Sequence, residues 1–325
     1  FGSRLNLLSN GGVMLGACPS RMDSPSSYIT PENFDSLTVI KGPQTVLWGP
    51  GASAATILFE REPETFSELG GRVDASLLAG SDGRFDSAID AATGNRLGYL
   101  RLLANHSTAN DYQDGNGDEV HSQWEKWSSD LVLGWTPTTD TLVELTVGTG
   151  DGEAAYAGRG MDGSQFERDS LALRVVQENL GEVLQKVEAR VYYNYADHVM
   201  DNYTLRTPPT SGMMAGPRAT NVDRRTLGGR LATTWEWRDQ ELVVGLDGIQ
   251  KGNRPGLPEG DYRHDPSEKE AEFSQYGLFG ELIWRADKDS RVIGGLRLDR
   301  AEAEDWRAAS ASAGQTRRET LPSGF

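Results

Sequence analysis

The sequence predicts a mainly β chain, a transmembrane antiparallel β-barrel that follows a small N-terminal α+β domain. From Gly70 onward there are roughly eleven segments in which apolar and polar residues alternate, the period of a half-buried strand. The connections between these segments alternate between short and long, and tryptophans precede the short ones. A soluble sandwich has no reason to place its long loops at every second connection, whereas an outer-membrane barrel does, so we favour the barrel.

Residues 1–66 are predicted to form a separate small domain. This stretch is rich in turns, and its Gly-Pro clusters at 42–43 and 49–51 surround short apolar runs. Two of these runs, 37–40 and 56–59, have the composition of strands. The charged, proline-containing segment 61–64 then links this domain to the long alternating region, which we assign to residues 67–325.

The connections of the second region fall into two sets. Short turns are predicted at 93–95, 137–140, 179–182, 238–240 and 286–290, and long polar loops at 108–122, 151–165, 197–222 and 251–271. Barrels of the outer membrane have short turns on the periplasmic side and longer loops on the extracellular side. The rhythm of the connections therefore predicts which end of each strand faces the cell exterior.

The two faces of the predicted strands differ in character. Between residues 183 and 196 the odd positions are mostly apolar or aromatic, as at Val191 and Tyr193, while the even positions include Lys186, Glu188 and Arg190. One face suits lipid and the other suits a polar lumen. Four tryptophans precede short turns and should form an interfacial girdle at one rim: Trp135, Trp235, Trp237 and Trp284.

The composition limits the classes of partner that the chain is expected to bind. The 325 residues carry a net charge of −16, with 37% hydrophobic residues and 38 glycines. A polyanion such as nucleic acid would be repelled, so no nucleic-acid partner is expected, while a cation suits this charge. Most acidic surfaces are simply solvated, and that interpretation stays open. No run of about 18 apolar residues indicates a transmembrane helix.

Both ends of the chain suggest a fragment. The start, Phe1-Gly2-Ser3-Arg4, has neither the charged nor the apolar region of a secretion signal. The last residues, 321–325, show no natural end either, and an open sheet of strands cannot be stable in lipid. We therefore expect the chain to be cut at both ends, with further strands in the parent protein.

Soft metal ligands occur at two places in the sequence. Cys18 is the single cysteine, and Met22 follows four residues later, so one helical turn would bring their side chains onto the same face. His198 and Met200 continue the polar parity of their strand, which points both into the lumen about 6.5 Å apart. A bulge there would reverse that parity.

A thiolate, two thioethers and an imidazole form a set that selects Cu(I) and also accepts Cu(II). Zinc stays open as an alternative, although thioethers are poor zinc ligands. Each residue also has an ordinary interpretation, since a lone cysteine is most often a small buried hydrophobe and methionines often fill gaps in a core.

The segment 39–53 reads Val-Ile-Lys-Gly-Pro-Gln-Thr-Val-Leu-Trp-Gly-Pro-Gly-Ala-Ser and resembles the plug signature of the TonB-dependent outer-membrane receptors. The resemblance implies that 1–66 is the C-terminal part of a plug domain and that 67–325 is the N-terminal part, roughly half, of a 22-stranded transmembrane barrel. It also implies a transporter of the bacterial outer membrane, not an enzyme. Its partners would be membrane lipid and the TonB-ExbB-ExbD complex, contacted through a TonB box missing from this chain.

Within that family, residues 11–23 resemble copper receptors of the OprC/NosA type, whose plug carries C-x-x-x-M and whose barrel carries H-x-M. This resemblance implies a copper site made of Cys18, Met22, His198 and Met200, with copper imported between plug and barrel. Two alternatives stay open. The same barrel could carry a siderophore or another metal chelate, or the chain could be a secreted β-rich carbohydrate-active enzyme.

Overall fold

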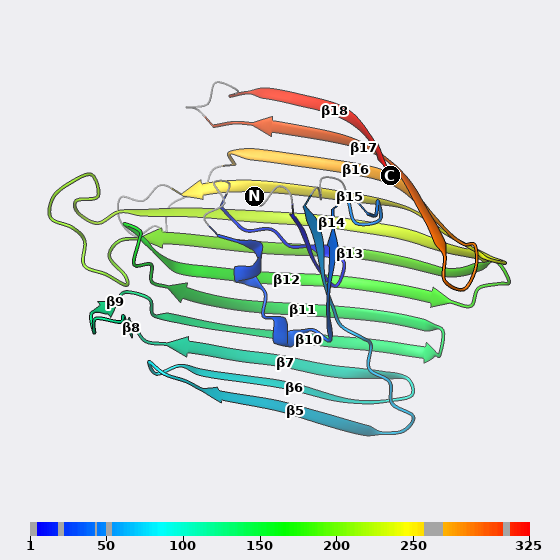
Figure 1. Ribbon diagram of the computed structural model, residues 1–325, viewed down its shortest axis with the longest axis horizontal. Coiled ribbons are helices and arrows are strands. Elements are labelled where there is room, and N and C mark those ends of the chain that lie inside the picture. The colour runs from blue at the N-terminus through cyan, green and yellow to red at the C-terminus, as the bar shows by residue number, and fades with distance from the viewer. Residues whose placement is uncertain (1–4, 19–22, 43, 50–53, 257–268, 308–312) are drawn as a thin grey trace.

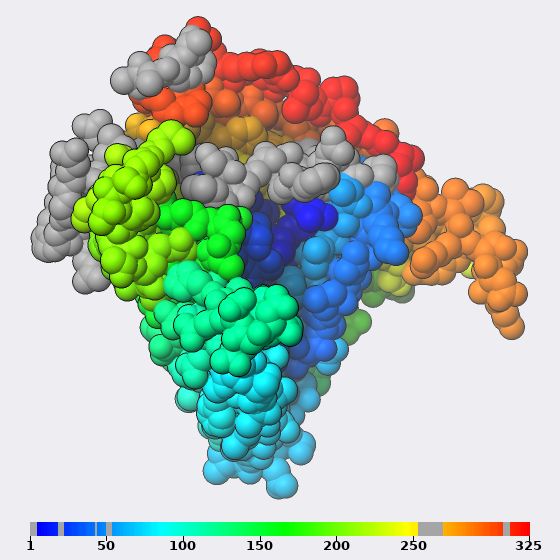
Figure 2. All heavy atoms as spheres, turned by 60° about the vertical axis from the view of Figure 1, so that its left-hand side comes forward, coloured from blue at the N-terminus to red at the C-terminus, as the bar shows by residue number. Residues whose placement is uncertain are grey.

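The computed structural model describes residues 5–18, 23–42, 44–49, 54–256, 269–307 and 313–325, and it contains a small sheet packed against one face of a large sheet (Figure 1). The large sheet curves around the small one, so that the small domain occupies the concave side (Figure 2). Within the described ranges, no helix has the length and apolar character needed to cross a membrane.

The small domain, here called the plug, contains a four-stranded sheet in the order β2-β1-β4-β3. Strands β1 and β4 run parallel, while the other two pairs are antiparallel. The strands predicted at 37–40 and 56–59 are confirmed, each one residue longer at both ends. The plug elements are β1 (Leu5–Ser9), β2 (Gly12–Val13), η1 (Pro25–Tyr28), η2 (Pro31–Asn33), β3 (Ser36–Lys41) and β4 (Ala55–Glu60).

The large sheet, here called the wall, has twelve strands where the sequence predicted about eleven. Every neighbouring pair is antiparallel, and the strands follow chain order except that β8 and β9 form a separate hairpin. The wall strands are β5 (Gly70–Ala79), β6 (Phe85–Asn95), β7 (Gly98–Ala109), β10 (Trp124–Thr138), β11 (Thr141–Ala154), β12 (Asp162–Glu178), β13 (Leu184–Asp201), β14 (Ala219–Trp237), β15 (Gln240–Gly256), β16 (Ala271–Arg285), β17 (Arg291–Asp305) and β18 (Gln315–Gly324). The hairpin strands are β8 (Tyr112–Gln113) and β9 (Glu119–Val120).

The alternation of short and long connections is confirmed, but all four predicted long loops overlap strands. Residues 108–109 belong to β7, 151–154 to β11, 162–165 to β12, 219–222 to β14 and 251–256 to β15. Residues 197–201 belong to β13, because the ladder to β14 continues from Asp197↔Asp223 to Asp201↔Ala219. The polar composition of this stretch resembles a loop, yet its backbone groups are paired in the ladder as far as Asp201. The loop predicted at 108–122 likewise contains the β8–β9 hairpin.

The predicted faces are confirmed by exposure. On the convex side Val191 is 56% exposed and Leu278 is 62% exposed, whereas Arg190 and Glu281 are buried on the concave side. Three of the four girdle tryptophans, Trp135, Trp235 and Trp284, are exposed, and all four lie next to the short turns. The convex face therefore suits lipid, and the concave face is a polar lumen that holds the plug.

Glycines in the wall leave room for aromatic rings that face the lumen. Gly228 lies opposite Tyr192 across the β13–β14 ladder, and a Cβ added at Gly228 would lie 2.2 Å from the tyrosine ring carbon Cζ. Gly228→Ala is therefore expected to destabilise the protein by about 1–3 kcal/mol, the usual cost of overpacking. The shift in the urea midpoint of unfolding would measure this loss.

Gly280→Ala is the matched control for this prediction. Gly280 also lies in the wall, but the atoms nearest to its added Cβ are 4.0 Å away. We expect its midpoint to stay close to that of the parent protein. Equal midpoints for the two variants would show that the position of the Tyr192 ring does not require a glycine at position 228.

Candidate metal site between plug and wall

The plug side of the site is a short loop held by one carboxylate. Asp23 accepts hydrogen bonds from the backbone N–H of Ala17 at 2.6 Å and of Cys18 at 2.9 Å. Tyr28 donates its hydroxyl to the same carboxylate at 2.6 Å. Asp23 and Cys18 are both buried. These bonds fold the chain back on itself and fix the backbone at Cys18.

The wall side of the site is the upper part of β13. His198 is 1% exposed, and its Nδ1 lies 3.2 Å from the backbone carbonyl of Gln165. A carbonyl only accepts, so Nδ1 carries the proton and Nε2 keeps its lone pair. Nε2 is buried and has no hydrogen-bond partner among the described residues. A buried nitrogen without a hydrogen-bond partner destabilises the fold unless it binds a ligand such as a metal ion or a water molecule.

Plug and wall meet in one buried cluster. Cys18 and Ala17 pack with Phe166 of β12 and with Ala196 of β13, and the ring of Phe166 stacks on His198 with centroids 4.6 Å apart. Ala196 and His198 are two residues apart on the same face of the strand. The structure thus brings Cys18 and His198 to the same interface.

Of the other two predicted ligands, the structure describes one. Met200 is buried, 4% exposed, and it follows His198 on the lumen parity of β13. The register shift nearby lies between Gly163 and Gln165 of β12, so β13 itself keeps its alternation. Met22 lies outside the described residues, as does most of the predicted helical turn from 18 to 22.

Extracellular loops are tied together just beyond this site. Asp162 lies at the outer end of β12 and forms an ion pair with Arg206 from the next long loop. The same guanidinium donates to the backbone carbonyls of Arg159 at 2.6 Å and Tyr156 at 2.9 Å. His121 also contacts Asp162, at 2.9 Å. Three successive loops are therefore pinned to one buried carboxylate.

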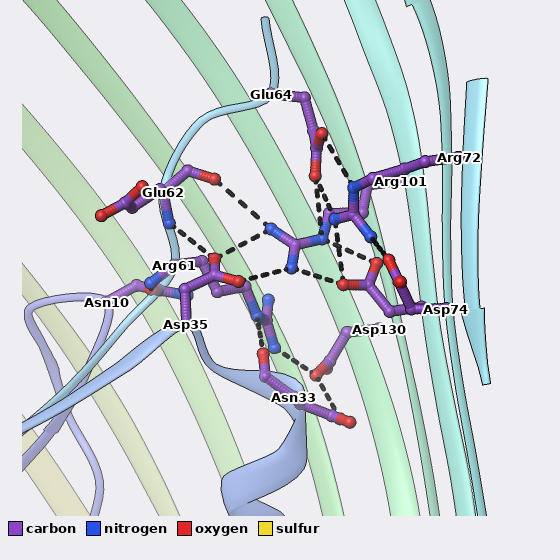
Figure 3. Close-up of polar contacts among 11 residues, drawn as sticks. Asn10, Asn33, Asp35, Arg61, Glu62, Glu64, Arg72, Asp74, Arg101 and Asp130 are labelled. Atoms are coloured by element: carbon purple, nitrogen blue, oxygen red, sulfur yellow. Dashed lines mark hydrogen bonds and ion pairs between the residues drawn. The ribbon is translucent and has the colours of Figure 1, made fainter. Parts of the chain in front are cut away.

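Two charged contacts hold the plug to the first half of the wall (Figure 3). Arg101 of β7 bridges Asp35 of the plug at 3.0 Å and Asp90 of β6 at 2.7 Å. Arg61, just after β4, pairs with Asp130 of β10 at 2.5 Å, with both side chains almost fully buried. Burial raises the pKa of Asp35, but the hydrogen bonds and charge of Arg101 outweigh it, so the pKa lies below its ordinary value.

Sequence reasoning missed three residues that shape the site: Asp23, Tyr28 and Phe166. Asp23 directly follows the C-x-x-x-M element, and that adjacency was the only signal available for it. Burial, and after it the charge of Asp23, raises the pKa of Tyr28, so its hydroxyl stays protonated and keeps donating. Nothing in the sequence indicates that Phe166 stacks on His198.

A membrane-embedded antiparallel wall that encloses a globular plug defines a class of outer-membrane receptor. The family model described as TonB dependent receptor-like, beta-barrel matches residues 103–324, which is more than half of the chain. The chain therefore belongs to the TonB-dependent receptors, which are outer-membrane receptors and transporters. Membership of this family does not favour the alternative of a carbohydrate-active enzyme.

Solved structures place the chain more closely. It is similar to the copper transporter OprC, with 62% sequence identity and a TM-score of 0.96, over 100% of this chain and 52% of that one. The hemophore receptor HasR of Serratia marcescens gives 17% identity and a TM-score of 0.73, over 100% and 52% of the two chains.

The FrpB iron transporter from Neisseria meningitidis gives 14% identity and a TM-score of 0.71, over 99% of this chain and 54% of that one. The likeness to FrpB and HasR shows the fold alone. The chain spans about half the length of these structures. No curated protein matches the sequence.

Proposed function

We propose that this chain is part of a TonB-dependent receptor that binds copper between plug and wall and imports it into the periplasm. The observation that carries the proposal is the buried Nε2 of His198, which has a free lone pair at the interface where Cys18 is packed. The similarity to the copper transporter OprC over the whole chain supports copper as the cargo.

The chemistry of the donor set favours copper over harder metals. Cys18, Met22, His198 and Met200 offer one thiolate, two thioethers and one imidazole, and soft sulfur ligands select Cu(I) while imidazole also suits Cu(II). The carbonyl of Gln165 holds the Nδ1 proton of His198, the kind of outer hydrogen bond that orients a histidine ligand. Cu(I) is therefore the favoured state of the bound ion.

Release of the ion requires the plug to move relative to the wall, because the proposed ligands come from both. The TonB-ExbB-ExbD complex would supply the force through a TonB box, while the convex face stays in membrane lipid. Pulling the plug would separate Cys18 and Met22 from His198 and Met200 and halve the number of ligands. An ion held by two ligands dissociates far more readily than one held by four.

Anomalous scattering at the copper edge from crystals of the intact, copper-loaded receptor tests the proposal. We expect one strong peak between the side chains of Cys18 and His198. A peak present at the zinc edge but absent at the copper edge would assign the site to zinc. The absence of any peak at this interface would instead favour a receptor for a siderophore or another chelate, with the sulfur residues incidental.

A further inference from the structure

The carboxylate of Asp23 is a buried charge whose hydrogen-bond donors are all neutral, a situation that it shares with Asp201 at the end of β13. It is 3% exposed, and the donors that it accepts from are two backbone N–H groups and the hydroxyl of Tyr28. All three donors are neutral. Within the described part of the chain no lysine, arginine or histidine forms a salt bridge with it, whereas the buried Asp130 and Asp299 each have an arginine. Buried charges are normally paired or bound to metal.

The position of this charge points to the proposed ion. Asp23 binds the backbone N–H of Cys18 and is the residue after Met22. On the wall side, Tyr28 donates to the same carboxylate and its ring packs edge-on against Phe166 with centroids 6.1 Å apart, and Phe166 in turn stacks on His198. A negative charge therefore lies next to Cys18 on the plug, in the same buried cluster of side chains that reaches His198 on the wall.

We propose that Asp23 is a positioning residue that also supplies a fixed negative charge to the copper site, in addition to the thiolate of Cys18, an inference that rests on the proposed function. Its hydrogen bonds hold the backbone at Cys18, and the arriving cation provides the positive charge that no described residue provides. The second negative charge makes the site more selective for ions of higher charge than the thiolate, thioethers and imidazole alone would be.

The test separates charge from shape by comparing two ions in the intact receptor. Charge–charge energy scales with the charge of the ion, so loss of one negative charge weakens Cu(II) about twice as much, on a logarithmic scale, as Ag(I). We expect Asp23→Asn to lower Cu(II) affinity roughly 10–100-fold, as for other outer partners of a metal site, and Ag(I) affinity about 3–10-fold. Isothermal titration with each ion gives the ratio.

Three variants serve as controls for this ratio. Tyr28→Phe removes one donor but keeps the charge, and Asp23→Glu moves the carboxylate but keeps the charge, so both should keep the parent ratio of Cu(II) to Ag(I) affinity. Asp35→Asn removes a plug carboxylate that pairs with Arg101, and it should change neither affinity. If Asp23→Asn binds neither ion, the test depends on Asp23→Glu. A Cu(II) to Ag(I) affinity ratio in Asp23→Glu as low as the one expected for loss of the charge would overturn the inference.

The outcomes distinguish this inference from the proposed function. A parent receptor that binds neither ion contradicts the copper site itself. A parent receptor that binds both ions, with equal losses or no loss in Asp23→Asn, leaves the copper site standing and overturns the role of Asp23 as its charge. If Tyr28→Phe shifted the Cu(II) to Ag(I) affinity ratio as much as Asp23→Asn does, the shift would come from loop geometry. That result would also overturn the role of the Asp23 charge.

Discussion

An intact receptor that carries both Cys18→Ala and Met22→Ala is expected to lose its copper. The double substitution removes the thiolate and one thioether and leaves only the two wall ligands. Loss of even an outer partner of a metal typically costs 10–100-fold in affinity, so we expect a loss of more than about 100-fold here. Elemental analysis of the purified protein after dialysis against a weak chelator would measure the copper that remains.

A methionine that is exposed to solvent provides the matched control. Met213 lies in the long loop after β13 and is 92% exposed, so Met213→Ala removes a thioether without touching the proposed site. Its copper content should equal that of the parent receptor. If the double variant kept its full copper content, Cys18 and Met22 would not be ligands, and the metal would have to be held elsewhere.

Asp130→Ala is expected to lower the free energy of unfolding by roughly 3–5 kcal/mol, the cost of removing one partner from a buried ion pair. Asp130 pairs with Arg61 at 2.5 Å and with Arg168 at 2.8 Å, and all three side chains are nearly inaccessible to water. Without the carboxylate, two guanidinium groups stay buried with no counter-charge. Urea unfolding in detergent or vesicles, followed by tryptophan fluorescence, would measure the change.

Asp74→Ala is the control for this second prediction. Asp74 pairs with Arg72 at 2.7 Å, but its side chain is 74% exposed, and exposed ion pairs contribute about 0–1 kcal/mol. Because Arg61 follows the last plug strand, Asp130→Ala should also make the plug more sensitive to protease. Equal unfolding curves for Asp130→Ala and Asp74→Ala would mean that Arg61 and Arg168 find other partners or water when the carboxylate is removed.

Much of the wall could be predicted from local pattern. Alternation of side chains is a property of each strand alone, so the lipid-facing side of β13 and the lumen parity of His198 follow from neighbouring residues. Where loops were wrongly predicted, as at 197–201, polar side chains resembled a loop although the backbone stays paired with β14. Polar side chains indicate contact with water, and the end of a strand contacts water as a loop does. Polarity alone therefore does not distinguish the two.

The sequence by itself determined the order of plug and wall, the rhythm of the connections, the tryptophan rim and the identity of the soft donors. Only the tertiary structure decided that Asp23 folds back onto Cys18, that Phe166 stacks on His198 and that Nε2 is left without a partner. The reason is physical. The alternation along a strand depends on residues two positions apart. Burial and hydrogen bonding at this interface instead depend on two parts of the chain about 180 residues apart, which meet only when the wall closes around the plug.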